Sequence, residues 1–267
     1  MAAKPIAKYR IITQAASFIA ANLGFTFGMT GMVYPFFFCY ASPGACASCP
    51  LGLIEHAVSG GKKNFCLLVY VTSFIALIGL VFGRAACGWA CPIGTIQDTI
   101  NKLFGKIRSK FKIKNWNSEK YLRYIKYAAL AYVVIGAAFV ALPTFTDLCP
   151  IGVLTGTFPH LAISADTFTF GEFFAIGMFS FGFFIALIIL VGRGWCKYVC
   201  PIGAMYAPMN KLSILKLTLD KEKCKNCGAC TNACPMGIDV QKDANRNPEC
   251  ILCGRCVDAC KPGCLRM

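Results

Sequence analysis

The sequence is poor in charged residues, and those present are mostly of one sign. Only 15% of its 267 residues are Asp, Glu, Lys or Arg, while 57% are hydrophobic, and the mean hydropathy is +0.58. This balance excludes an ordinary soluble domain and predicts a chain that lies largely in a bilayer. Basic residues number 27 against 12 acidic ones. Because the basic residues gather beside apolar segments, we expect them to contact anionic membrane lipid, and we expect no nucleic acid partner.

Histidine is also scarce, whereas cysteine is abundant. The chain holds two histidines, His56 and His160, and no Cys-x-x-Cys-His sequence, which excludes covalently attached c-type haem and a multi-haem path. It holds 18 cysteines, and most recur as Cys-x-x-Cys or Cys-x-x-x-Cys-Pro. This spacing favours metal clusters over a disulfide framework.

Four apolar segments are long enough to cross about 30 Å of hydrocarbon. They cover residues 11–38, 65–82, 121–142 and 170–192. Lys and Arg precede the first segment and follow the second and fourth, whereas residues 143–169 contain neither. The positive-inside rule therefore predicts a multi-pass protein of the prokaryotic inner (cytoplasmic) membrane, with both termini in the cytoplasm.

The membrane part is predicted to form two tandem two-helix repeats. Each half has a Cys-Pro-apolar-Gly element, which begins at Cys49 or Cys149. Each half later has a Gly-Arg pair followed by Cys-x-x-x-Cys-Pro-Ile-Gly, over residues 87–94 and 196–203. Because two spans per repeat keep both halves in the same orientation, we expect a symmetry axis along the membrane normal.

Such an axis would gather four cysteines at the inner ends of the second and fourth spans, namely Cys87, Cys91, Cys196 and Cys200. Four thiolates are a complete ligand set for one Fe-S cluster, so we predict an additional cluster in the membrane domain. The proline after Cys91 and after Cys200 predicts a helix start, where the helix dipole stabilises an anion. The alternative is that these are neutral, buried thiols that only shape the repeat.

A second group of polar and sulfur-containing residues is expected near the outer face. Cys46, Cys49 and Cys149, with Cys39 as a further candidate ligand, are predicted to form a metal site, and a disulfide is the alternative in an oxidising compartment. Glu55, His56 and His160 follow the Cys-Pro elements. They mark the expected position of a quinol site, because imidazole and carboxylate groups accept protons. The alternative for the two histidines is ordinary polar surface.

The composition changes abruptly near the C-terminus, where Cys-x-x-Cys-x-x-Cys-x-x-x-Cys occurs twice. This triple spacing is typical of two [4Fe-4S] clusters and unlike a zinc site, and in such runs the fourth cysteine ligates the other cluster. The predicted ligands are Cys224, Cys227, Cys230 and Cys260 for one cluster, and Cys234, Cys250, Cys253 and Cys256 for the other. Cys264 is left over and is interpreted as a small buried hydrophobic residue.

The predicted fold is thus an all-α membrane domain of four transmembrane helices, residues 1–217, followed by an α+β bacterial-type 2[4Fe-4S] ferredoxin domain, residues 218–267. On its paired Cys-x-x-x-Cys-Pro motifs, four spans and C-terminal cysteine runs, the chain resembles the NapH-type membrane ferredoxins known from periplasmic nitrate reductase systems. It differs from that pattern in its outer cysteines. The resemblance implies quinol oxidation, or electron transfer through the membrane to or from an Fe-S partner subunit.

Three functions are consistent with these features. The first is an electron-transfer subunit of a respiratory or energy-conserving oxidoreductase complex, in contact with other Fe-S subunits and with quinone. The second is a maturation factor that reduces a metal or cysteine in another protein. The third is a redox sensor. The number of cluster motifs favours conduction, because sensing needs only one cluster.

Overall fold

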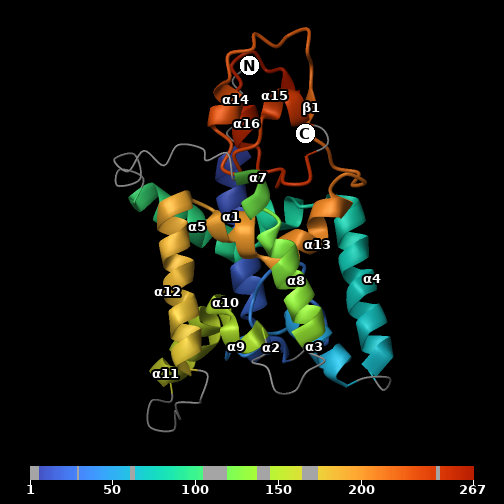
Figure 1. The fold of residues 1–267 in the computed structure, drawn as a ribbon, viewed down its shortest axis with the longest axis vertical. Helices are drawn as coiled ribbons and strands as arrows, with labels where there is room; N and C mark the ends of the chain where they lie inside the picture. The colour runs from blue at the N-terminus through green and yellow to red at the C-terminus, as the bar shows by residue number, and fades with distance from the viewer. Residues whose placement is uncertain are drawn as a thin grey trace.

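The computed structural model describes residues 6–28, 30–60, 64–104, 119–136, 145–163, 174–244 and 247–267. It is mostly helical and elongated. In Figure 1, helices α4 (Phe65–Phe82), α8 (Ile125–Gly136) and α12 (Phe174–Val191) run along the long axis, and the C-terminal segment with its short helices caps one end. Both chain termini lie at that same end.

Most of the remaining elements are shorter, apart from α1 with 16 residues and α5 with 12. Those before the C-terminal segment are α1 (Ile6–Ala21), α2 (Gly24–Phe27), α3 (Pro50–Ser59), α5 (Pro92–Leu103), α7 (Glu119–Leu122), α9 (Phe145–Leu148), α10 (Pro150–Gly152), α11 (Phe158–Ile163) and α13 (Pro201–Met209), with single π-helical turns η2 (Ala86–Ala90), η3 (Val153–Thr157) and η5 (Trp195–Val199). The C-terminal segment contains β1 (Thr218–Leu219), α14 (Ala229–Asn232), α15 (Val240–Asp243), α16 (Arg255–Asp258) and β2 (Leu265–Arg266).

Two helices, α4 and α12, are long and apolar enough to cross a membrane by length and composition, each with 18 residues and a mean hydropathy of 2.6. Only 17% of each is buried inside the structure. A soluble protein would bury such helices in its core, so their outward apolar faces favour contact with lipid. Helix α8 is apolar but shorter, and residues 137–142 of the third expected span lie outside the described residues.

The first expected span, residues 11–38, is not one continuous helix. Helix α1 ends at Ala21, and Gly24 begins a separate short turn. A Cβ atom at Gly24 would lie 2.6 Å from the carbonyl oxygen of Ala45, so this position tolerates no side chain. The chain then turns extended, and Val33 forms a parallel bridge with Ser48. Apolar composition alone could not distinguish this buried extended segment from a helix.

Helices α4 and α12 end in the same way. Gly83 and Gly192 follow them with φ angles of 56° and 57°, a conformation that glycine adopts without strain. This left-handed turn redirects the chain, and the next residue in each case, Arg84 or Arg193, is at most 1% exposed. The two arginines are therefore carried into the interior from equivalent positions.

The C-terminal segment has the strand pairing and short helices of a small ferredoxin. Strands β1 and β2 pair antiparallel, with Thr218 opposite Arg266 and Leu219 opposite Leu265. Its hydrophobic residues Met236, Ile238 and Ile251 belong to the same core cluster as residues of the membrane part. The ferredoxin segment is thus packed onto the helices and shares a core with them.

Candidate iron-sulfur sites

The inner cysteines of the two Cys-x-x-x-Cys-Pro motifs lie near one another in the structure. Cys87, Cys91, Cys196 and Cys200 are each 6–8% exposed. Burial, together with charge repulsion from the nearby Cys196 and Cys87, raises the pKa of Cys91 to about 12. Burial and the same neighbours raise the pKa of Cys200. The four thiols are therefore close enough to interact.

The two motifs are built alike. The first cysteine of each lies in a π-helical turn, η2 or η5, closed by hydrogen bonds from Cys91 N–H to the Ala86 carbonyl oxygen (3.1 Å) and from Cys200 N–H to the Trp195 carbonyl oxygen (2.9 Å). The second cysteine precedes the proline that starts α5 or α13. π turns are rare and occur often at functional sites.

Polar hydrogens converge on these sulfur atoms. The backbone N–H groups of Gly94 and Gly203 lie near Cys91 and Cys200 and act to lower the pKa of these thiols. Gln97 Nε2 donates to Cys196 Sγ at 3.0 Å, and Arg84 donates to Cys87. Such donors stabilise thiolates and anionic clusters. The inner site therefore offers the four sulfur ligands and the positive surroundings that an Fe-S cluster needs.

A buried carboxylate, Asp98, stands beside this site and was not anticipated. Arg193 Nε and Nη2 donate to its two oxygens at 2.9 and 2.8 Å. Arg255 Nη2 lies 3.0 Å from Oδ2, and Arg10 is a third partner. Burial alone would raise the pKa of Asp98, but hydrogen bonds and positive charge from Arg193, Arg255 and Arg10 lower it to about 2. Asp98 therefore stays ionised and joins α1, the end of α12 and α16.

Glu249 forms the corresponding cluster on the other side. It accepts a hydrogen bond from Arg84 Nη1 at 2.6 Å and pairs with the buried Lys126 of α8. Arg84 and Arg193 were noticed in the sequence as parts of the Gly-Arg pairs. Their carboxylate partners were missed because they lie 165 and 95 positions away. The sequence did indicate that such partners come from a small set, because the whole chain has only 12 acidic residues.

One half of the ferredoxin cysteines surrounds a small cavity. Cys234, Cys250, Cys253 and Cys256 line a space of about 20 Å³ together with apolar residues such as Met236 and Ile238. Gly254 lies between Cys253 and Cys256 and adopts a φ of 75° at the start of α16. Glycine takes this conformation without strain, so the chain can turn between the two cysteines. These four cysteines are the set that sequence spacing assigned to one cluster.

The other half contains an additional thiol. Cys224, Cys227, Cys230 and Cys260 are the predicted set, and Cys260 Sγ lies 3.1 Å from Cys264 Sγ. Cys264 is buried, as expected, and is also hydrogen-bonded to Cys224. Its side chain thus touches two of the predicted ligands and is more than a space-filling residue. Sequence spacing gave no reason to place Cys264 there, because it falls outside the repeated run.

The ferredoxin segment meets the inner site at a close backbone contact. A Cβ atom at Gly88, in η2, would lie 2.2 Å from the carbonyl oxygen of Ile251. Trp89 Nε1 donates to the Leu252 carbonyl oxygen at 2.8 Å, and Asn210 Nδ2 donates to the Cys250 carbonyl oxygen at 3.0 Å. The loop with Cys250 and Cys253 therefore rests directly on the turn that holds Cys87.

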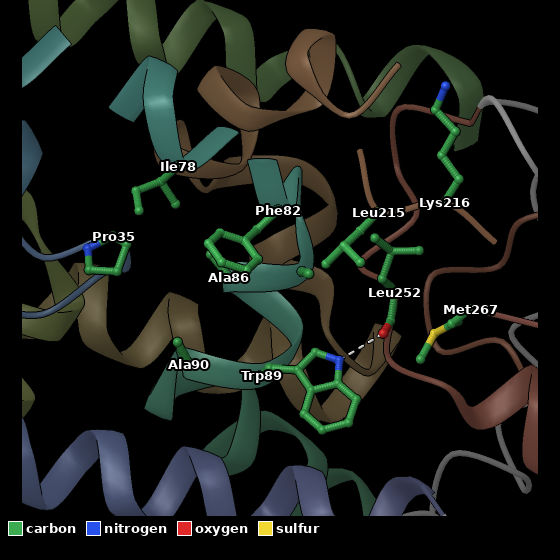
Figure 2. Close-up of a pocket in the computed structure, with 11 residues that line it drawn as sticks. Pro35, Ile78, Phe82, Ala86, Trp89, Ala90, Leu215, Lys216, Leu252 and Met267 are labelled. Carbon is green, nitrogen blue, oxygen red and sulfur yellow. Dashed lines mark hydrogen bonds between the residues drawn. The ribbon is translucent and has the colours of Figure 1, made fainter. Parts of the chain in front are cut away.

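An almost wholly apolar cavity of about 450 Å³ opens at this junction. Figure 2 shows Phe82, Ala86 and Trp89 on one side and Leu215, Leu252 and Met267 on the other, with Trp89 bonded to the Leu252 carbonyl. Lys216 is the single charged residue among those that line it. The cavity thus adjoins both the inner site and the ferredoxin, and it suits an apolar molecule.

The outer cysteines divide into two groups. Cys39, Cys49 and Cys149 line one small cavity with Phe37, Phe145 and other residues. Cys46 is absent from that lining, because its Sγ faces the Tyr34 hydroxyl at 3.5 Å and the Ala20 carbonyl oxygen at 3.3 Å. The structure therefore places Cys49 and Cys149 on one cavity together with Cys39, and Cys46 lies apart from them. All 18 cysteines are unbridged.

The expected quinol residues at this end do not form one pocket with free polar groups. Glu55 is buried and accepts hydrogen bonds from the backbone N–H of Phe145 and the hydroxyl of Thr146. His56 is exposed on α3, and His160 Nε2 lies 3.2 Å from the Ala41 carbonyl oxygen. The Glu55 carboxylate has a structural role that its position in the sequence did not reveal.

The arrangement fits clusters better than single metal ions. Within the described ranges, no group of three or more His, Cys, Asp or Glu side chains has the compact geometry of a one-ion site. A cubane spreads its thiolates over different iron atoms, so its ligands lie farther apart than those of zinc. Buried N–H groups without a protein partner, including Arg84 Nε and Arg193 Nη1, are available to an anionic group.

Comparisons with known proteins agree with this interpretation. A family model described as a 4Fe-4S binding domain matches residues 64–112 and 173–219, which contain the four inner cysteines. A model described as a 4Fe-4S dicluster domain matches residues 216–261. That range includes Cys260 but ends before Cys264.

The curated relatives have low sequence identity, but the similarity extends over most of this chain. An uncharacterized protein of Methanocaldococcus jannaschii is 27% identical over 205 residues, which is 76% of this chain and 79% of the relative. The ferredoxin-type protein NapH of Escherichia coli is 26% identical over 187 residues, 70% of this chain and 59% of NapH. The methylamine utilization ferredoxin-type protein MauN of Methylobacillus flagellatus is 26% identical over 168 residues, 62% of this chain and 52% of MauN. No solved structure matches.

The cysteine motifs, the matched domains and these relatives agree on one class of protein. The outward-facing apolar helices α4 and α12 add a membrane location. The chain is similar to the NapH-type, polyferredoxin-like proteins, and two of its regions match 4Fe-4S binding domains.

Proposed function

We propose that the chain is the iron-sulfur electron-transfer subunit of a respiratory or energy-conserving membrane complex. It would pass electrons between its ferredoxin module and quinone or an Fe-S partner subunit. The observation that carries this proposal is the contact between the inner cysteine site and the ferredoxin, where Ile251 packs against Gly88 with no room for a side chain. This contact would let electrons pass between the two sites without a mobile carrier.

The proposed ligand sets are those that the cysteine spacing predicts. Cys87, Cys91, Cys196 and Cys200 would hold one Fe-S cluster in the membrane domain, and the eight ferredoxin cysteines of residues 224–260 would hold two [4Fe-4S] clusters. Such clusters supply one-electron redox chemistry at potentials set by charge and hydrogen bonds. The chain contributes the N–H groups of Gly94 and Gly203 and the amide of Gln97, which orient the sulfurs and stabilise negative charge.

The proposed topology has four crossings in two tandem units, with both termini and the ferredoxin on the cytoplasmic side of the inner membrane. The equivalent turns at Gly83 and Gly192 and the like-built motifs that follow support two units. The basic residues of segment 105–118 support the orientation by sequence, although that segment lies outside the described residues.

If quinone is the redox partner, the cavity at the ferredoxin junction is the better place for it than the outer histidines. That cavity holds about 450 Å³ and adjoins the turn with Cys87. At the outer end, by contrast, the Glu55 carboxylate already accepts hydrogen bonds from Phe145 and Thr146. Partner subunits would be identified by stoichiometric co-purification with an oxidoreductase, and accumulation of an apo-enzyme in a deletion strain would favour a maturation role instead.

The inner cluster is tested by a Cys91→Ser, Cys200→Ser double variant of the full-length protein. Its iron content is expected to fall by about four atoms per chain, one cluster's content, while the spectra of the ferredoxin clusters persist. The measurement is iron and sulfide analysis after anaerobic purification. Cys66→Ser, at an exposed cysteine of α4, is the matched control and should lose none. Unchanged iron in the double variant would rule out this cluster.

The neighbouring thiol Cys264 gives a separate prediction. A Cys264→Ala variant is expected to keep its full iron content but to lower the potential of one ferredoxin cluster by roughly 40 mV. The cause is loss of the hydrogen bond to Cys260 Sγ, worth about 1 kcal/mol. Hydrogen bonds to cluster sulfurs favour the more negative, reduced state. A redox titration followed by EPR measures the shift, and loss of about four iron atoms would instead make Cys264 a ligand.

A further inference from the structure

We propose that Cys39, Cys49 and Cys149 bind a further iron-sulfur cluster, held by three cysteines, at the end of the molecule remote from the ferredoxin. In Figure 1 α3, α9 and α10, which flank these cysteines, lie toward the opposite end of the long axis from α14–α16. The three side chains are each 7–8% exposed and line one cavity. This site goes beyond the proposed function, which needs only the inner and ferredoxin clusters.

The cavity is comparable in size with one of the ferredoxin cluster sites. It measures about 20 Å³, as does the space lined by Cys234, Cys250, Cys253 and Cys256. Both are lined otherwise by mainly apolar residues. By this measure the outer site resembles a place where sequence spacing and a family match both predict a cluster.

Cys39 and Cys149 meet at Gly152, where an added Cβ atom would lie 3.7 Å from Cys39 Sγ and 3.8 Å from Cys149 Cβ. Cys49 and Cys149 each precede the proline at a helix start, in the same Cys-Pro-apolar-Gly arrangement as Cys91 and Cys200 of the inner site. The local structure that the inner site uses is therefore built again at the outer end.

Charge favours three thiolates over four here. The inner site has Arg84 and Arg193 beside it, whereas the residues that line the outer cavity include neither Lys nor Arg. A buried anionic group without nearby cations is costly, and each thiolate adds one negative charge. A [4Fe-4S] cluster with three cysteine ligands carries one negative charge fewer than the same cluster with four, and it suits these surroundings better.

None of the three cysteines lies in a segment that the family models match, since those begin at residue 64 and leave out residues 113–172. A disulfide would use only two of the three thiols and leave the third beside it unpaired. Cys46, the nearest cysteine in sequence, bonds Tyr34 and does not line the cavity. It therefore serves as a matched control.

The test uses the full chain, purified without oxygen, and four variants: Cys39→Ser, Cys49→Ser, Cys149→Ser and Cys46→Ser. The first three are expected to lose about three or four iron atoms per chain and to share the loss of one EPR signal, while Cys46→Ser keeps both. Wild-type iron must also exceed that of the inner and ferredoxin clusters together, a measurement that does not depend on any variant folding.

Several results would overturn the proposal. One is wild-type iron that the inner and ferredoxin clusters fully account for. Another is equal loss from Cys46→Ser, which would assign a different ligand set. A third is a crosslinked peptide between two of the three cysteines after denaturation and alkylation without reductant. The Cys91→Ser, Cys200→Ser variant separates this proposal from the proposed function, because its outer signal should survive.

Discussion

Asp98→Asn is expected to destabilise the protein by roughly 3–5 kcal/mol, the usual cost of removing one partner from a buried ion pair. The substitution keeps the shape of the side chain but removes the charge that Arg10, Arg193 and Arg255 share. Arg10 and Arg193 are at most 1% exposed, so their charges would stay buried without compensation. A lower thermal midpoint of the detergent-solubilised protein is the measurement.

The same carboxylate predicts a pH dependence of definite sign. Its pKa is about 2 in the folded chain and 3.8 as the ordinary value. Asp98 therefore contributes stability that is complete above about pH 4 and is lost as the pH falls toward 2. The difference in thermal midpoint between wild type and Asp98→Asn should narrow over that range. The measurement is the difference between the two thermal midpoints, because acid also damages the iron-sulfur clusters and does so in both proteins.

A control of the same chemistry is Asp220→Asn. Asp220 pairs with Lys223 at 3.1 Å on the surface, where both side chains are more than a third exposed, and exposed pairs contribute little to stability. Its midpoint should match that of the wild type. Equal midpoints for the Asp98 variant and this control would show that the buried arginines find other partners.

The second large effect is expected from Gly88→Ala. The added Cβ would meet the Ile251 carbonyl oxygen at 2.2 Å, and a backbone atom on a ligand-bearing loop has little freedom to move away. Overpacking of this kind costs about 1–3 kcal/mol. We expect the ferredoxin loop to separate from η2, with faster hydrogen exchange at residues 250–254 and slower electron exchange with the inner site.

Gly182→Ala is the matched control, because that glycine of α12 has no atom within 4 Å of its would-be Cβ. Alanine favours a helix over glycine by up to about 1 kcal/mol, so this variant should be as stable as the wild type or more so. If Gly88→Ala leaves exchange in residues 250–254 unchanged, the contact is looser than described and the proposed electron route through it fails.

Motifs whose ligands follow one another in sequence were predictable from the sequence. Cys250 and Cys253 lie on one loop, and the paired Cys-x-x-x-Cys-Pro motifs could be matched by their repetition, which also predicted that Cys87 and Cys196 would meet. Each of these predictions needed only local geometry plus one symmetry argument. In the structure the residues of the inner set lie near one another, and those of one ferredoxin set line a common cavity.

Contacts between distant segments were not predictable in this way. Cys46 and Cys49 have a spacing typical of shared ligands, yet the bridge between Val33 and Ser48 directs Cys46 toward Tyr34. Cys39 reaches the cavity because the first apolar segment is partly extended and not wholly helical. The partners of Asp98 and Glu249 likewise depend on how segments far apart in the sequence pack together. Hydrophobic periodicity carries no information about such packing.

The ion cluster at Glu249 has a consequence for the order in which the protein is made. Arg84 and Lys126 leave the ribosome long before Glu249, their shared counterion, is synthesised. Until the last segment of the chain docks, these two cations lack the acidic partner that they share in the complete fold. Completion of the C-terminal segment therefore supplies their counterion, and a chain truncated before residue 249 leaves both cations without it.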